Sequence, residues 1–173
     1  MFWTVLDKTP TFGNYRRLAE HARRVGSWPA WRERALDRVR DEISRREVPK
    51  FRWQPPADAG LLVEIFLWED DPDQAWAEAQ RGGCSGPVVM RLARANRDRR
   101  PAEVIPLYEK EIESLIEKRN NQAYAQAVEL LGEVEVLFTG AGRPDGFPGY
   151  VAGLRRRHEP KRNLMKLLDS RGW

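Results

Sequence analysis

The sequence predicts an all-α protein in which helical hairpins stack as a degenerate, tetratricopeptide-like α-solenoid of about eight helices. Apolar residues recur at spacings of three and four along most of the chain, which is the period of an amphipathic helix. Alanine stands beside large aromatic residues within these stripes, so neighbouring helices can approach closely. Gly, Pro or Asn occurs at most corners, and a succession of such hairpins builds a solenoid. A compact, non-repeating helical bundle is the alternative architecture.

The first predicted hairpin turns sharply within the stretch RVGSWPAW. Gly26 ends the first helix, Ser27 caps the second, and Pro29 fits the first turn of that second helix. Two large aromatic residues, Trp28 and Trp31, follow the corner. We expect both to be at least partly buried in the wedge where the two helices diverge.

Glycine, proline, asparagine and capping residues at similar corners predict eight helical segments in four pairs. These pairs are 11–26 with 29–46, 58–69 with 72–82, 86–98 with 101–119, and 121–139 with 147–169. The run LLVEIFLW is apolar on nearly every side, which favours a buried helix. A strand is the competing interpretation of so short a run, but no second strand is evident to pair with it.

The last segment carries two features that shape its end. Pro160 lacks the backbone N–H and is expected to break the helix near residues 156–158. Leu164, Met165, Leu167 and Leu168 are too apolar to leave in water, so the end of the chain is expected to dock on the preceding hairpin.

We expect one domain over residues 1–173, because a chain of this length can bury one substantial core. Residues 47–57, VPKFRWQPPAD, hold three prolines and two aromatic residues and predict a non-helical surface loop. A second loop, rich in glycine, is predicted at 139–149. Its glycine spacing matches no phosphate-binding motif.

The chain has one cysteine, Cys84, and two histidines, His21 and His158, so it cannot form an internal disulfide or close a tetrahedral zinc site. We expect Cys84 to be a small buried residue and His158 to lie on a solvated helix face. No metalloprotease, nucleophile-elbow or P-loop motif occurs. The sequence therefore predicts a protein that is not an enzyme and has no catalytic residue, cofactor or metal.

The most apolar run has eight residues, Leu61–Trp68, far short of the roughly 20 that span a bilayer. The N-terminal stretch lacks the charged start and long apolar run of a signal peptide. We therefore expect a cytoplasmic location and no membrane partner.

A solenoid offers a groove lined by side chains from successive helices, suited to a peptide or a partner protein. Glu64 would be costly as a lone charge in its apolar run, so it either pairs with an arginine from another helix or lines the groove beside Trp68. The candidate groove residues are Tyr15, Glu64, Trp68, Trp76, Tyr108 and Tyr124. For each aromatic residue, a place in the core is the competing interpretation.

Charge is distributed unevenly within the net charge of +4. Residues 1–54 carry 13 basic and 7 acidic side chains, residues 55–154 carry 10 and 17, and residues 155–173 carry 7 and 2. Nucleic-acid binding by the basic first and last helices is therefore an alternative function, and an unevenly charged solvated surface is the other explanation. The candidate contact residues are Arg16, Arg17, Arg23, Arg24, Arg155, Arg156, Arg157, Lys161 and Arg162.

Short motifs in a particular order carry a resemblance to a known family. They include Tyr15-x-x-Leu18, Gly26-Ser27-Trp28, Leu62-Val63-Glu64-Ile65, Ala75-Trp76-x-x-Ala79, Gly83-Cys84-Ser85, Pro106-x-Tyr108, Asn120-Asn121-x-x-Tyr124 and Lys161-Arg162-Asn163-Leu164-Met165. Over most of residues 11–169 the chain resembles the helical C-terminal region of bacterial SWIM zinc-finger proteins. The resemblance implies a tetratricopeptide-like region that mediates contacts and has no catalytic residue.

The zinc finger of that family, C-x-C with C-x-H, has no counterpart in this chain, so zinc binding does not carry over. The chain is then either a separated helical region or a fragment of a longer protein. Pro160 is a second departure, because it stands where the family is continuously helical.

Overall fold

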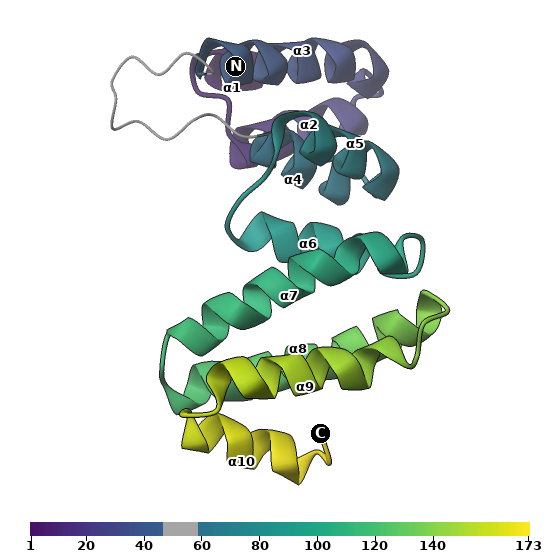
Figure 1. The fold of residues 1–173 in the computed structure, drawn as a ribbon. Coiled ribbons are helices and arrows are strands. Elements are labelled where there is room, and N and C mark those ends of the chain that lie inside the picture. Colours follow the sequence, from purple (N-terminus) through teal and green to yellow (C-terminus); the bar gives the residue numbers. More distant parts are fainter. Residues whose placement is uncertain (47–58) are drawn as a thin grey trace. The chain divides into compact units, whose positions relative to one another are not determined.

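The computed structural model describes residues 1–46 and 59–173, and these residues form only helices and the turns between them (Figure 1). The all-α prediction is confirmed. The described residues form ten helices: α1 Phe2–Lys8, α2 Phe12–Arg24, α3 Trp28–Arg46, α4 Gly60–Trp68, α5 Pro72–Gly82, α6 Pro87–Asn96, α7 Pro101–Glu117, α8 Asn121–Gly140, α9 Gly146–His158 and α10 Arg162–Ser170. The predicted loop 47–57 lies outside the described residues.

The count of ten corrects the predicted eight at the two ends of the chain. Helix α1 was not predicted. The last predicted segment divides into α9 and α10 on either side of Pro160, so the predicted break is confirmed. The run LLVEIFLW lies in α4, where five of the nine helix residues are buried, which confirms the helix over the strand.

The glycine-rich loop is shorter than predicted, because α8 continues through Gly140 and α9 begins at Gly146. Gly142 has φ +70° at the turn, a conformation that side-chain-bearing residues rarely adopt. A Cβ on Gly146 would lie 2.7 Å from the Phe138 ring, so a glycine lets this helix start pack closely on α8.

The described residues divide into two compact units, residues 1–92 and residues 93–173, with the division inside α6. We call them the N-terminal unit and the C-terminal unit. Stacking of the hairpins into a solenoid stays a prediction.

In the N-terminal unit, α1 packs on α2 and α3, α2 and α3 contact α4, and α4 pairs with α5 (Figure 1). Gly26 has φ +69° at the corner between α2 and α3. Trp28 and Trp31 are half-buried, as predicted. The Trp28 ring meets Tyr15 edge-on, and the Trp31 ring lies against Trp3.

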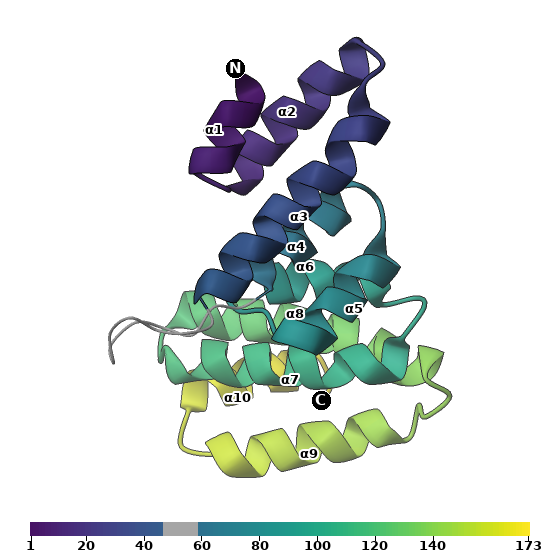
Figure 2. The same cartoon turned by 90° about the horizontal axis from the view of Figure 1, so that it is seen from above.

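In the C-terminal unit, α7 and α8 form a long hairpin (Figure 2). Helix α8 also contacts α9 and α10. The Asn120 side chain caps α8 by accepting a hydrogen bond of 2.9 Å from the Ala123 amide. Leu164 and Leu168 of α10 are fully buried, so the predicted docking of the chain's last segment on the preceding hairpin is confirmed. Among the described residues, no helix combines the length and apolar character needed to cross a bilayer.

Candidate functional site

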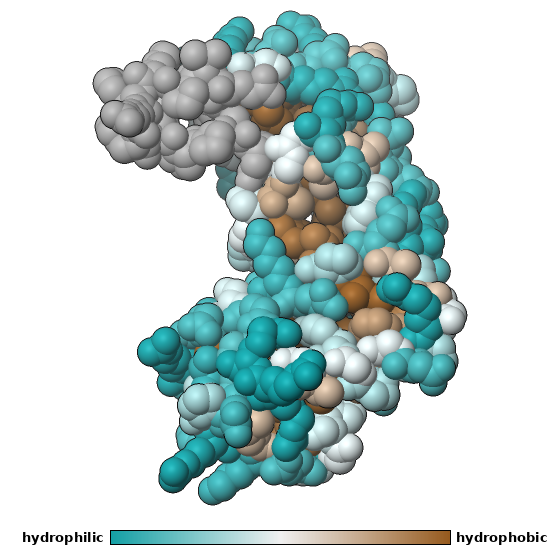
Figure 3. Space-filling model, viewed as in Figure 1, coloured by the Kyte–Doolittle hydropathy of each residue, from teal (hydrophilic) through white to brown (hydrophobic). Residues whose placement is uncertain are grey.

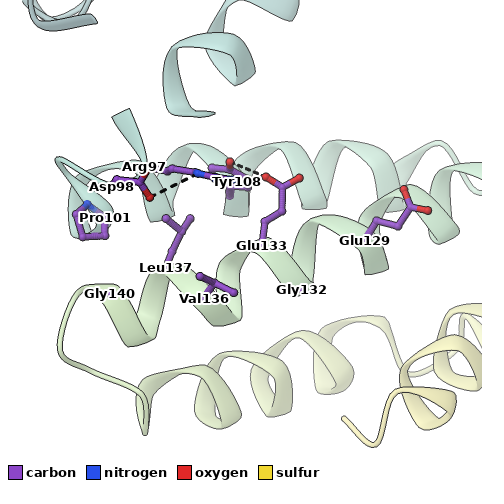
Figure 4. Close-up of a pocket in the computed structure, with 10 residues that line it drawn as sticks. All are labelled: Arg97, Asp98, Pro101, Tyr108, Glu129, Gly132, Glu133, Val136, Leu137 and Gly140. Carbon is purple, nitrogen blue, oxygen red and sulfur yellow. Dashed lines mark hydrogen bonds and ion pairs between the residues drawn. The ribbon is translucent and has the colours of Figure 1, made fainter. Parts of the chain in front are cut away.

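The C-terminal unit has a groove of about 540 Å³ between the turn that precedes α7, the first half of α7, and α8 (Figure 4). Its volume lies in the range of ligand-binding pockets. The lining residues are Arg97, Asp98, Pro101, Tyr108, Glu129, Gly132, Glu133, Val136, Leu137 and Gly140.

Helix α8 supplies most of the wall because its residues fall on one helical face. Glu129, Glu133, Val136 and Gly140 are spaced by four, three and four residues, which is the spacing of one stripe. Figure 4 shows the two glutamates projecting from the same side of α8.

Val136 is the apolar feature of this stripe. Hydrophilic side chains dominate the face of the C-terminal unit drawn in Figure 3. Val136 is 71% exposed, and among residues 93–173, all of which are described, it is the only exposed large hydrophobic residue. An apolar side chain that borders a groove is available for burial against a ligand.

A hydrogen-bonded cluster holds Glu133 in place at the groove. The Tyr108 hydroxyl donates a bond of 2.8 Å to Glu133 Oε2. The Arg94 guanidinium donates to both carboxylate oxygens, at 3.0 and 3.4 Å. Burial raises the pKa of Tyr108 to about 12, and the Glu133 hydrogen bond and charge act in the same direction. At neutral pH the tyrosine is therefore a donor to a fixed carboxylate.

The remaining charges give the groove an acidic lining. Asp98 forms an exposed ion pair of 3.6 Å with Arg97. Glu129 is exposed one turn before Glu133, and none of the described residues forms an ion pair with it. Arg97 offsets Asp98 and Arg94 offsets Glu133, so the carboxylate of Glu129 leaves the groove with an excess of one negative charge, which favours a cationic group over an anionic one.

Four of the predicted groove residues belong to the N-terminal unit, where the Tyr15 and Trp68 rings are in contact, and two, Tyr108 and Tyr124, belong to the C-terminal unit. Tyr15, Trp76 and Tyr124 are buried in the hydrophobic core, so the core interpretation describes them. Tyr108 is also buried, yet it lines the groove.

The side chains of Trp68 and Glu64 on α4 contact other side chains of the N-terminal unit. The Trp68 ring is half-buried, meets Tyr15 edge-on and lies under the Arg23 guanidinium at 4.6 Å. Glu64 accepts a hydrogen bond of 2.5 Å from Arg91, so its predicted pairing with an arginine from another helix is confirmed.

Sequence reasoning missed Glu129, Glu133 and Val136. The available signal was a valine on the stripe of these two glutamates, on a face of α8 that the core does not use.

The C-terminal basic residues are largely engaged in ion pairs. Arg155 bonds Asp169 at 2.7 Å, Arg157 bonds Glu113 of α7 at 2.7 Å, and Lys161 bonds Glu117 of α7 at 3.2 Å. Arg156 and Arg162 are exposed. Arg155, Arg157 and Lys161 therefore connect α9 and the turn after it to acidic side chains of the same unit.

The N-terminal basic residues lie on α2. Arg16 pairs with Glu20 at 3.4 Å, and Arg24 donates to the Glu20 carbonyl oxygen at 3.4 Å. Arg17 is exposed, and Arg23 lies over the Trp68 and Trp28 rings. The two basic sets belong to different units.

The solvated position predicted for His158 is wrong. Only 6% of this residue is exposed, and its ring lies between Glu113, at 2.7 Å from Nε2, and Lys161, at 2.9 Å from Nδ1. Burial raises the pKa of the Glu113 carboxyl, but hydrogen bonds from Arg157 and His158 outweigh it and lower that pKa. Cys84 is half-buried rather than buried, because it lies in the turn between α5 and α6.

No group of three or more His, Cys, Asp or Glu side chains in residues 1–46 and 59–173 is arranged to hold a metal ion. No family model, curated protein or solved structure matches the chain. The relation to the helical region of SWIM zinc-finger proteins stays a prediction from the sequence motifs.

Proposed function

We propose that the chain is a non-enzymatic helical module that binds a segment of a partner protein in the groove between α7 and α8. The observation that carries this proposal is the exposed Val136 beside Glu129 and Glu133 on one stripe of α8. The matching segment has an aliphatic or aromatic side chain for Val136 and a lysine or arginine for the glutamates.

Three features of the site contribute to the free energy of binding. Burial of the exposed surface of Val136 contributes about 1 kcal/mol. A cation beside Glu129 gains about 0.2–1 kcal/mol at an exposed position. Glu133 is already held by Tyr108 and Arg94, so little of its side-chain freedom is lost on binding. These terms are typical of a weak, reversible peptide interaction.

The resemblance to the helical region of SWIM zinc-finger proteins supports the same class of function, because that region is implied to mediate contacts. A cytoplasmic location belongs to this proposal too. The ion pairs of Arg155, Arg157 and Lys161 weigh against nucleic-acid binding, since phosphates would have to displace carboxylates from them.

The test is a selection from a displayed library of random 12-residue peptides on the full chain. We expect enrichment of peptides that combine basic and large apolar residues. Fluorescence anisotropy with a labelled selected peptide should show at least a tenfold loss of affinity for Glu129→Lys and for Val136→Asp.

Glu135→Lys is the matched control, because Glu135 is an exposed residue of α8 that does not line the groove. This variant should bind as wild type does. Selected peptides that bind all three variants equally would overturn the proposal. So would a chain that selects no peptide yet retards a labelled oligonucleotide at low salt.

A further inference from the structure

The N-terminal unit has a second hollow, of about 430 Å³, between α1, the second half of α2 and the start of α3. Its lining is mainly apolar and aromatic, and includes Phe2, Trp3, Leu18, His21, Val25 and Trp31. We call this hollow the N-terminal pocket. The Trp3 and Trp31 rings lie against each other inside it, with their centroids 5.5 Å apart.

Exposed apolar surface is concentrated around this pocket. The described residues include five exposed large hydrophobic side chains, and four of them, Met1, Phe2, Val5 and Val25, belong to α1 or to the ends of α1 and α2. Val25 is 63% exposed. Clustered exposed apolar residues around a hollow mark an interaction site more than isolated ones do.

The rim of the pocket is basic. The Arg34 guanidinium lies 4.2 Å from the Trp3 ring centroid and 5.3 Å from that of Trp31. On α2, Arg17, His21 and Arg24 occupy one stripe at spacings of four and three, directly beside the lining residues of that helix. Arg17, Arg24 and Arg34 are all exposed.

Acidic side chains do not cancel this rim. Glu20, the acidic residue of α2, is exposed and pairs with Arg16, and it holds Arg24 only through its backbone carbonyl. On α1, Asp7 pairs with Arg38 at 3.2 Å, and on α3, Glu33 pairs with Arg32 at 2.9 Å and Asp37 with Arg40 at 3.0 Å. The apolar pocket is therefore bordered by positive charge, the opposite of the acidic groove in the C-terminal unit.

We propose that the N-terminal pocket binds an acidic, amphipathic helix of a partner protein. The apolar face of that helix places a large side chain against Trp3, Trp31 and Val25. Its flanking Asp and Glu residues meet Arg17, Arg24 and Arg34. This is the helix-in-groove mode of recognition, with charge complementarity at the rim. The site is independent of the proposed function of the C-terminal groove.

A protein segment fits this surface better than an anionic bilayer does. The two tryptophan rings line a concave hollow, contact each other at a tilt of 38° and lie under the Arg34 guanidinium, rather than projecting outward as interfacial anchors do. A hollow of this kind accepts a side chain, whereas a bilayer engages a protruding apolar face.

The probes for the test are two labelled 16-residue amphipathic peptides that share a leucine stripe, one with glutamates and the other with lysines on the polar face. Anisotropy should show that the glutamate peptide binds the full chain at least tenfold more tightly than the lysine peptide. Val25→Asp and the double variant Arg17→Glu with Arg24→Glu should each weaken glutamate-peptide binding at least tenfold.

Two matched controls lie in the C-terminal unit. Val136→Asp makes the same change at another exposed valine, and Arg156→Glu with Arg162→Glu makes the same change in net charge. Both should bind the glutamate peptide as wild type does, with circular dichroism confirming that every variant is folded. Equal loss in the controls would show nonspecific charge attraction and overturn the proposal.

Two further results would also overturn it. One is glutamate-peptide binding that survives both N-terminal variants. The other is a chain that ignores the peptide but co-sediments with phosphatidylserine–phosphatidylcholine vesicles in a manner that Val25→Asp abolishes. That second result would assign the pocket to a membrane surface.

Discussion

The two units each contain a tyrosine, a glutamate and an arginine joined by hydrogen bonds, yet the two clusters differ in what surrounds them. In the N-terminal unit, Tyr15 donates to Glu69 at 2.9 Å, and Arg32 donates to the other carboxylate oxygen at 2.6 and 3.0 Å. In the C-terminal unit, Tyr108 donates to Glu133 at 2.8 Å, and Arg94 donates to both oxygens of that carboxylate. Three helices contribute to the second cluster, α6, α7 and α8.

The clusters differ in exposure. The Glu69 side chain is 6% exposed and the Glu133 side chain 33%. Trp28 and Trp68 both meet the Tyr15 ring edge-on, so aromatic rings cover the first cluster. The second cluster opens on the groove. The same hydrogen-bonded set of side chains is therefore part of the core where aromatic rings close over it, and borders a groove where they do not.

Replacement of Glu69 and of Glu133 should give the largest difference between the two clusters in the free energy of unfolding. Glu69→Ala leaves a buried hydroxyl and a half-buried guanidinium without their acceptor, and should lower the free energy of unfolding by about 2–4 kcal/mol. Glu133→Ala, at a more solvated site, should cost about 0.5–1 kcal/mol. Urea denaturation followed by circular dichroism measures both. Equal losses would show that the clusters do not differ in burial as described.

Removal of the tyrosine hydroxyls should also lower the free energy of unfolding more in the N-terminal unit than in the C-terminal unit, but by a smaller margin. Tyr15→Phe should cost about 1–2 kcal/mol because the Glu69 carboxylate loses a buried donor. Tyr108→Phe should cost about 0.5–1 kcal/mol, since water in the groove can replace the lost donor. A larger loss for Tyr108→Phe, measured in the same urea titration, would contradict the comparison.

The two tyrosines should also make the stability of the protein depend on pH in the alkaline range. Burial raises the pKa of Tyr108 to about 12 and raises that of Tyr15 further. A raised pKa means that the folded state favours the protonated hydroxyl, so this stabilisation is fully present below pH 10 and is lost progressively above it. Tyr108 stops contributing further loss near pH 12.

The measurement is the free energy of unfolding between about pH 9 and 11.5 for wild type and for each Phe variant. Both variants should show a shallower decline than wild type. A decline that is unchanged in both would mean that neither hydroxyl stays protonated in the fold.

Local patterns in the sequence predicted most of the fold. Capping residues, glycine corners and apolar stripes located α2 to α8, and Pro160 located the break before α10. Helix α1 has seven residues, too few for a periodic pattern to register. The burial of His158 was missed because it follows three arginines, and the partners of two of them, Asp169 for Arg155 and Glu113 for Arg157, are set by packing rather than by spacing.

The candidate site was less predictable than the fold. Tyr108 was a candidate groove residue, but its partner Glu133 lies 25 positions away and Arg94 lies 39 positions from that glutamate. No local rule pairs residues at such separations. Which aromatic residues close a core and which border a groove depends on the helices that cover them, as Tyr15 and Tyr108 show.

The two proposed sites differ in charge preference: the groove at Val136 favours basic segments, and the basic-rimmed pocket at Val25 favours acidic ones. A crossed anisotropy titration tests it most directly, with the selected basic peptide and the glutamate peptide each measured against Val136→Asp and Val25→Asp. Val136→Asp should weaken only the basic peptide, and Val25→Asp only the glutamate peptide, each at least tenfold. A single variant that weakens both peptides, or two variants that weaken neither, would contradict it.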